Sequence, residues 1–276
     1  MKLFKKIRNL YKKNLKVGVV LGSGGRFGIS HIGVLKVLEK NNIKIDYLVG
    51  CSMGAIIGAI YAINPNIEEL EKKAVSLNKR DLIRLIDLGI TKTSLIKGKN
   101  IKKFIKELVG DKTFSDVKIP FKVVATDLET GEFVVINEGK LIDAIMASIS
   151  IPGIFPPVKL DRRLLVDGGV TNATPINVVK EMGADIIIGV DLTMKGQVKL
   201  ENLNIIQILL RTYDILRTQV TKNNIENNKN VLIIKPNIST LSKFKFYEIE
   251  KFINEGEKTA KKNLSKIKKL VFNEGL

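Results

Sequence analysis

The 276-residue chain has very few of the residues on which several common kinds of protein chemistry depend. Its one cysteine, Cys51, excludes a disulfide framework within the chain and is typical of a reducing compartment. Its one histidine, His31, excludes a metal site with two histidines, and a Ser-His-Asp triad would have to use it. With only 7 prolines and 45% hydrophobic residues, the chain is expected to fold around a buried core.

Acidic side chains and long apolar runs are scarce too. The chain has 28 acidic residues and 46 basic ones, which gives a net charge of +18. The longest nearly unbroken apolar run, residues 53–63, is about half of the ~20 residues that a membrane-spanning helix needs. The charged N-terminus lacks the apolar core of a secretory signal. We therefore expect a cytoplasmic protein without a membrane span, able to lie at the inner face of the membrane.

Residues 1–16 are expected to form a basic amphipathic segment ahead of a domain over residues 17–276. Apolar residues recur at helical spacing, with lysines on either side of them. Such a helix can lie in an anionic membrane surface, with its lysines near the phosphates. It can equally pack on the domain with its charges solvated, and both alternatives stand on the sequence.

Two consecutive units of strand, glycine-rich turn and helix follow this segment. They predict a parallel sheet with helices on its faces. Further strands are expected at 121–125, 133–136, 164–166, 186–190 and 231–234, and helical segments at 66–110, 176–181, 205–225 and 247–270. We therefore predict one α/β domain. The two units read strand 17–21, turn 22–25, helix 29–39, and then strand 45–49, turn 50–54, helix 55–63.

Ser52 is the candidate nucleophile. It is the centre of a G-x-S-x-G sequence that runs from Gly50 to Gly54, between a predicted strand and a predicted helix. A serine on such a turn is held in a strained conformation at the top of the sheet, where the helix N-terminus favours developing negative charge. The simpler alternative is a glycine turn whose serine caps the helix.

The glycine-rich loop from Gly22 to Gly28 offers backbone N–H groups near a helix N-terminus. Such groups bind phosphate or a substrate oxyanion. A dinucleotide-binding loop would need G-x-G-x-x-G, which Phe27 interrupts, although Asp46 stands about where a ribose-binding acid is expected. Beside a candidate serine elbow, the loop is better interpreted as an oxyanion hole.

Asp167 is the candidate base. It ends an apolar run and is followed by Gly168 and Gly169. A serine needs a neighbouring group to take its proton, and an aspartate at a strand end of the same sheet can do so. Alone, Asp-Gly-Gly is usually a turn, so the hypothesis depends on the other two motifs.

With these three motifs in order, the chain resembles the bacterial patatin-like phospholipases. The resemblance covers about residues 17–240. It implies a three-layer α/β/α domain with a mainly parallel sheet, and a serine acyl hydrolase without metal or cofactor. The matching stretches are LGSGGRFGISHIGVLKVLE, IDYLVGCSMGAIIGAIYA, ASISIPGIFPPVKLDRRLLVDGGVTNATPINVVKEMGADIIIGVDL and IIKPNIS.

The resemblance implies that Ser52 and Asp167 form a catalytic dyad and that Gly24 and Gly25 form the oxyanion hole. The family pattern G-G-G-x-[RK]-G is altered at two positions. Ser23 replaces the first glycine, and Phe27 stands at the basic position, with Arg26 one residue earlier.

Two further residues near these motifs are given structural roles. His31 is expected to bond a nearby backbone group. Cys51 is expected to pack with its side chain pointing away from the site.

The resemblance further implies a lipid ester as substrate, and the charge of +18 suits an anionic membrane surface. The same charge could be spread over solvated faces. A nucleic-acid-binding protein is disfavoured because no binding motif is present and aromatics are only 6%. A lipid-binding scaffold with weak turnover stays as the alternative, based on Ser23 and Phe27.

Overall fold

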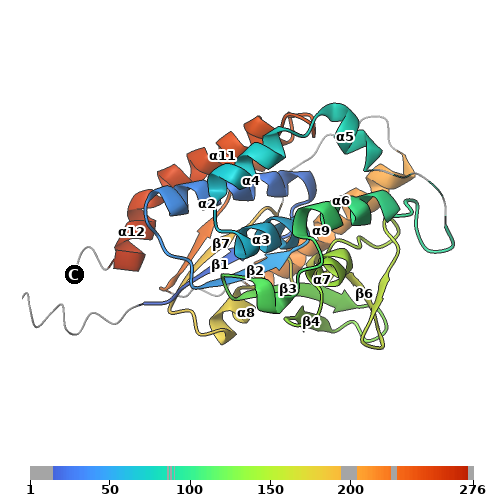
Figure 1. Cartoon of the computed structure of the whole chain (residues 1–276), viewed down its shortest axis with the longest axis horizontal. Helices are drawn as coiled ribbons and strands as arrows, with labels where there is room; N and C mark the ends of the chain where they lie inside the picture. The colour runs from blue at the N-terminus through green and yellow to red at the C-terminus, as the bar shows by residue number, and fades with distance from the viewer. Residues whose placement is uncertain are drawn as a thin grey trace, which may run out of the picture.

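A mixed eight-stranded sheet runs through the middle of the computed structural model (Figure 1). The strand order is β5-β6-β3-β2-β1-β7-β8, and β4 also pairs with β3. The structure describes residues 15–85, 87, 89, 91–193, 204–224 and 229–272. The strands are β1 Val17–Leu21, β2 Tyr47–Cys51, β3 Phe121–Asp127, β4 Phe133–Ile136, β5 Val158–Leu160, β6 Arg163–Asp167, β7 Ile186–Val190 and β8 Val231–Ile234.

The central strands are parallel, and the antiparallel pairing is confined to β4, β5 and β6. Strands β1 and β7 are buried along their whole length, because helices cover both faces of the sheet at these positions. This burial explains their continuous β-branched sequences, which are typical of parallel sheets. The mainly parallel α/β sheet predicted from the sequence is confirmed.

Helices cover the sheet on both faces, which confirms the three-layer prediction. Figure 1 shows α2, α3, α4 and α11 above the sheet and α8 below it. The helices are α2 Ser30–Lys40, α3 Met53–Ile63, α4 Ile67–Val75, α5 Lys79–Arg84, α6 Lys99–Val109, α7 Leu141–Ser148, α8 Ile176–Glu181, α9 Ile205–Asn224, α10 Ile238–Leu241, α11 Ile249–Lys262 and α12 Leu264–Phe272.

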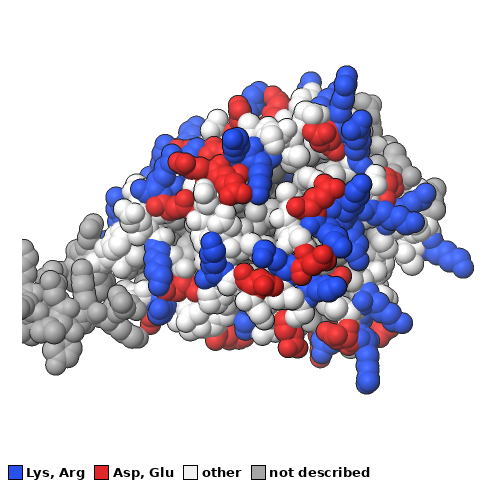
Figure 2. Space-filling model, viewed as in Figure 1, with Lys and Arg blue, Asp and Glu red and all other residues white. Residues whose placement is uncertain are grey.

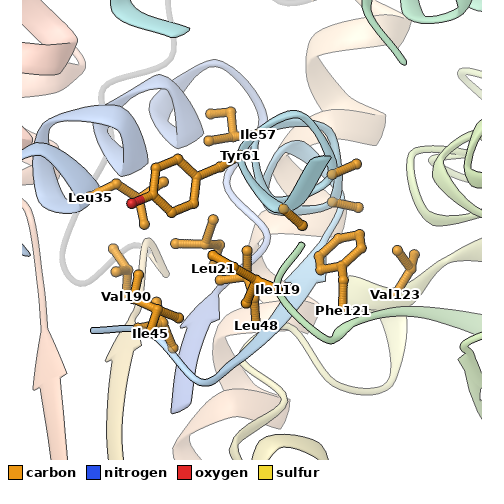
Figure 3. Close-up of a cluster of buried hydrophobic side chains, with 14 of the residues drawn as sticks. Leu21, Leu35, Ile45, Leu48, Ile57, Tyr61, Ile119, Phe121, Val123 and Val190 are labelled. Atoms are coloured by element: carbon orange, nitrogen blue, oxygen red, sulfur yellow. The ribbon is translucent and has the colours of Figure 1, made fainter. Parts of the chain in front are cut away.

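The larger core cluster fills the space between the sheet and α2, α3 and α7. Figure 3 shows its centre, where Leu35 of α2 and Tyr61 of α3 lie over Leu21 of β1 and Leu48 of β2. A smaller cluster on the opposite face joins Val20, Val49 and other sheet residues to α8. Since burying one such aliphatic side chain stabilises a fold by about 1.5–3 kcal/mol, these clusters hold the three layers together.

Some elements differ from the expected ones. Strand β2 begins at Tyr47 and not at residue 45, because the Asp46 carboxylate accepts a hydrogen bond from the Val17 N–H at 3.0 Å and fastens the start of β1. The basic stretch 66–110 is three helices, with irregular chain between α5 and α6. The C-terminal stretch is two helices that break at Asn263. Helix α7 and the short elements β5 and α10 were not expected.

The geometry of β3 explains how distant segments meet. Val123 and Val124 pair with β2 on one side and β4 on the other, while Ala125 pairs with β4 on one side and β6 on the other. Strands β2 and β6 therefore share one edge of β3 and run toward each other. They end at adjacent positions, with Cys51 opposite Val124 and Asp167 opposite Ala125.

Among the described residues, no helix combines the length and apolar character that a membrane crossing requires. Most of the predicted N-terminal segment, residues 1–14, lies outside the described residues. At its described end, Leu15 packs against the larger core cluster, and Lys16 forms an ion pair with Asp46 at 3.1 Å. The division between residues 1–16 and the domain therefore stays a prediction.

Candidate active site

Ser52 occupies the tight turn between β2 and α3. Its φ of 56° and ψ of −122° are strained for a residue with a side chain. Its N–H donates to Ser148 Oγ at 2.9 Å, which fixes the strained peptide. A Cβ atom on Gly54 would lie 1.9 Å from the Leu21 carbonyl oxygen, so only glycine lets α3 start this close to β1. The turn expected from the G-x-S-x-G sequence is present.

Asp167 is the last residue of β6, and its carboxylate lies beside the serine. Ser52 Oγ donates to Asp167 Oδ2 at 2.7 Å, while the Gly169 N–H donates to Oδ1 at 2.8 Å. Ser52 is 4% exposed and Asp167 fully buried. One carboxylate oxygen is thus held by the backbone, and the other faces the hydroxyl group. The structure thus brings together Ser52 and Asp167, the two residues that the sequence analysis expected to act as a pair.

Burial raises the pKa of Asp167 above the usual value of 3.8. Hydrogen bonds from Ser52, Gly169 and Tyr213, together with the charge of Arg217, oppose that shift. A carboxylate with a raised pKa is a stronger base than an exposed one. The environment of Asp167 therefore suits a group that removes a proton from serine.

The glycine-rich loop lies against the serine turn. A Cβ atom on Gly28 would be 2.5 Å from the side chain of Met53, the residue after the serine. Gly24 is extended, and Gly25 has a φ of 48°. Among the described residues, neither glycine N–H has an acceptor. Two N–H donors of this loop are therefore available to an acceptor, which an oxyanion hole would need.

The two altered positions of the loop have structural explanations. Phe27 is buried at 7% exposure in a small cluster with Leu192 and Phe252. The exposed Arg26 places its guanidinium 5.1 Å from the centre of the Phe27 ring. The Ser23 N–H donates to the Ala173 carbonyl at 2.7 Å. Apolar burial thus anchors the loop at the position where the family pattern has a basic residue.

Two residues of helix α9, Arg217 and Tyr213, hold the glycine loop in place, and the sequence analysis did not identify them. Arg217 is 1% exposed, and its guanidinium donates to the Ser23 carbonyl at 2.8 Å, the Leu192 carbonyl at 3.1 Å and Asp214 Oδ1 at 2.8 Å. One helical turn earlier, the Tyr213 hydroxyl lies 3.5 Å from Ser23 Oγ and also hydrogen-bonds Asp167. Helix α9 therefore fastens the glycine loop and the carboxylate to one another.

The remaining motif glycines lie close to neighbouring groups, three of them to backbone carbonyls. A Cβ atom on any of them would collide with a neighbouring group, so each fixes the approach of two segments. Those groups are the Val190 carbonyl at Gly22, the Gly54 carbonyl at Gly50, the Val124 carbonyl at Gly168 and the Tyr213 hydroxyl at Gly169.

His31 has the structural role that the sequence suggested. It is fully buried, and its Nε2 lies 2.8 Å from the Gly22 carbonyl oxygen, to which the ring N–H donates. Burial lowers the pKa of His31 to about 4, although this hydrogen bond opposes the shift. A neutral imidazole therefore holds the start of the glycine loop.

Cys51 packs in the smaller core cluster as expected, but the expectation that its side chain points away from the site is wrong, because its Sγ lies 4.0 Å from Asp167 Oδ1. Cys51 and Asp167 end two strands that meet along one edge of β3, opposite the adjacent residues Val124 and Ala125. Burial and the charge of Asp167 raise the pKa of the thiol, which makes it a poor nucleophile.

Asp46 lies just before β2, at the opposite end of that strand from Ser52. It forms ion pairs with Lys16 and Lys44 there, so it does not serve the glycine loop.

A family model described as "Patatin-like phospholipase" matches residues 19–180. An uncharacterised NTE-family protein of Mycobacterium tuberculosis is 37% identical over 177 residues, which are 64% of this chain and 49% of the relative. The Neuropathy target esterase sws of Drosophila melanogaster is 33% identical over 191 residues, 67% of this chain and 13% of the relative. This chain thus spans about half the length of the mycobacterial relative and far less of the fly protein.

Two solved structures resemble the fold. VipD from Legionella pneumophila superposes with a TM-score of 0.59 at 12% identity, covering 92% of this chain and 67% of that chain. The type III effector ExoU superposes with a TM-score of 0.50 at 12% identity, covering 92% of this chain and 53% of that chain. At this identity, the likeness shows a shared architecture.

Replacing Arg217 tests the anchoring of the loop by α9. Arg217→Met leaves the buried carbonyls of Ser23 and Leu192 without donors, so the free energy of unfolding is expected to fall by about 2–4 kcal/mol in urea titrations. The exposed Arg80→Met is the matched control and is expected to change it by less than about 0.5 kcal/mol. Equal effects of the two variants would contradict the anchoring.

Acid titration tests the buried state of His31. Between the pKa of about 4 in the fold and 6.5 in the unfolded chain, the unfolded state binds more protons, so stability falls as the pH drops through this window. From pH 7 to pH 5 the wild type is expected to lose about 2 kcal/mol more than His31→Gln in urea titrations. Identical losses in the two proteins would show that His31 is not held neutral.

Proposed function

The chain belongs to the patatin-like phospholipase family, and we propose that it is a serine acyl hydrolase that cleaves fatty-acyl esters of phospholipids or lysophospholipids. The observation that carries the proposal is the hydrogen bond of 2.7 Å from Ser52 Oγ to the buried carboxylate of Asp167. It joins a hydroxyl on a strained turn to a base, beside a loop with two N–H donors that have no acceptor in the part of the chain that the structure describes.

In the first step, Ser52 Oγ attacks the carbonyl carbon of the ester while its proton passes to Asp167 Oδ2. The carbonyl oxygen becomes an oxyanion, which the N–H groups of Gly24 and Gly25 stabilise. The ester bond then breaks. The leaving alcohol or lysolipid takes the proton back from Asp167, and the acyl group stays on Ser52.

In the second step, water attacks the acyl-enzyme and gives a proton to Asp167. The second tetrahedral intermediate collapses, Ser52 Oγ regains the proton and the fatty acid leaves. Asp167 thus acts as base and acid in turn. Its Oδ1 stays bonded to the Gly169 N–H and keeps Oδ2 directed at the serine.

The names of the relatives support ester cleavage. The fly relative is called an esterase, and a human relative, 33% identical over 67% of this chain and 14% of its own length, is called a patatin-like phospholipase domain-containing protein. Positive charge supports a substrate at an anionic membrane surface, since +18 attracts acidic headgroups.

A lipid-binding scaffold with weak turnover is the alternative. Its support was the altered glycine loop, with serine and phenylalanine at Ser23 and Phe27. In the fold, Phe27 is a buried anchor, and the N–H groups of Gly24 and Gly25 keep no internal acceptor among the described residues. These contacts favour the hydrolase.

Ser52→Ala and Asp167→Asn are each expected to lower fatty-acid release from mixed phospholipid vesicles by about 10³-fold or more. The first variant removes the nucleophile, and the second removes the proton acceptor at nearly constant size. The matched controls Ser76→Ala and Asp111→Asn alter exposed residues and should keep the wild-type rate. Near-wild-type release by Ser52→Ala would refute the assignment.

The acid side of the pH–rate profile tests the base. Hydrolysis needs the Asp167 carboxylate, so kcat/KM is expected to fall as the pH drops through a pKa above 3.8. The Tyr213 hydrogen bond lowers this pKa, so Tyr213→Phe should raise it and move the fall in rate to higher pH. A profile that stays in place or moves to lower pH would speak against Asp167 as the base.

A further inference from the structure

Helix α9 differs from an ordinary surface helix in where its side chains lie, since large apolar residues face solvent and polar residues are buried. Its outer face carries Ile205, Ile208, Ile215 and Leu216, which are 61%, 47%, 45% and 54% exposed. Residues 205, 208 and 215 lie three and seven positions apart, so they form one stripe along the helix. With Leu210, this helix holds five of the seven exposed large hydrophobic residues in the described part of the chain.

The inner face of α9 is polar. Tyr213, Arg217 and Thr221 follow one another at four-residue spacing, and all three are buried. Tyr213 and Arg217 bond the glycine loop, and the Thr221 hydroxyl donates to the Arg217 carbonyl at 2.8 Å. Helix α9 therefore buries several polar groups inside the protein and leaves five of its large hydrophobic side chains exposed to solvent. A contiguous exposed apolar stripe marks an interaction surface.

A loop with basic side chains meets α9 near this stripe through Gly153. Leu209 of α9 packs against Gly153, since a Cβ atom there would be 3.5 Å from the leucine side chain. Gly153 in turn accepts a hydrogen bond from the Leu95 N–H at 3.1 Å. The segment around Leu95 carries the exposed Lys92 and Lys97, and the following helix α6 carries Lys99 and Lys103.

These four lysines have no ion-pair partner among the described residues. Figure 2 shows basic side chains projecting at the end of the molecule where the chain enters α6 in Figure 1. The loop that meets α9 through Gly153 thus carries two lysines, Lys92 and Lys97, without an ion-pair partner among the described residues.

We propose that the outer face of α9, together with the loop that carries Lys92 and Lys97, docks the protein on an anionic lipid bilayer. Aliphatic side chains can enter the acyl boundary while lysines meet acidic headgroups. A second copy of the chain would bring its own net charge of +18, and that repulsion disfavours self-association.

Docking by α9 would place the bilayer over the candidate dyad, because the same helix contacts Asp167 and Ser23 from its inner face. Ser52 is only 4% exposed, so a substrate ester has to be brought directly to the active site before it can react. The inference deepens the proposed function, on which its kinetic part rests, by naming the substrate as lipid assembled in an anionic surface rather than dispersed ester.

The first test measures sedimentation with vesicles of phosphatidylcholine alone and of an equimolar mixture with phosphatidylglycerol. All proteins carry Ser52→Ala, so that the lipids stay intact. Adding Ile208→Ser and Leu216→Ser is expected to weaken binding to the anionic vesicles by at least about tenfold. The matched control, Ile83→Ser with Leu128→Ser, removes side chains that are 49% and 50% exposed elsewhere and should bind as the parent does.

Lys92→Glu with Lys97→Glu is a second variant that leaves the helix intact. It should lose binding to anionic vesicles, with little change on phosphatidylcholine alone. Absence of binding by the parent protein, or equal binding by the α9 variant and the matched control, would overturn the proposal. So would light scattering that shows a dimer for the parent and a monomer for the α9 variant, since a second copy would then occupy the face.

The kinetic test uses chains that keep Ser52. The ratio of the rate on anionic vesicles to the rate on a water-soluble short-chain ester should fall at least about tenfold in the α9 variant and stay constant in the matched control. A protein that binds vesicles through α9 but hydrolyses neither substrate would refute the proposed function and leave the docking surface standing. Hydrolysis of the esters without α9-dependent binding to the vesicles would refute the docking surface and leave the proposed function standing.

Discussion

Two strands that run toward each other along one edge of β3 create the site. Strand β2 ends at Cys51 and β6 ends at Asp167, opposite adjacent residues of β3, so the turn after β2 delivers Ser52 to the carboxylate. The register of β3 fixes this meeting. A shift of one residue would turn side chains to the other face of the sheet and separate the pair. The antiparallel strands at this side of a mainly parallel sheet thus position the candidate chemistry.

The second support is α9, which comes from late in the sequence and binds both halves of the site. Arg217 holds the carbonyls of Ser23 and Leu192, while Tyr213 reaches Ser23 and Asp167. A buried guanidinium is costly unless its donors are satisfied, and here each nitrogen has an acceptor. The polar inner face explains why the aliphatic residues of this helix remain in solvent. Catalytic geometry and membrane docking would then depend on the same element.

The sequence predicted the parts of the site that obey local rules. Ser52 became a candidate because strand, glycine turn and helix follow each other, and Asp167 because it ends an apolar run before two glycines, whereas the family resemblance supplied the roles of Gly24 and Gly25. It could not predict Tyr213 and Arg217, since periodicity places residues on a face without saying which face is buried. Cys51 was misjudged for a related reason, because its position beside Asp167 depends on the pairing of β2 and β6 with β3. The polar, buried face of α9 is visible only once the sheet and its neighbours are assembled.

The central claim is that Ser52 is a nucleophile activated by Asp167. The most direct measurement treats the protein with a fluorophosphonate, digests it and locates the modified residue by mass spectrometry, with the labelling rate compared between wild type and Asp167→Asn. The account predicts modification of the peptide that contains Ser52, at a rate that falls strongly in the aspartate variant. Modification of another residue, no modification at all, or equal rates in the two proteins would contradict it.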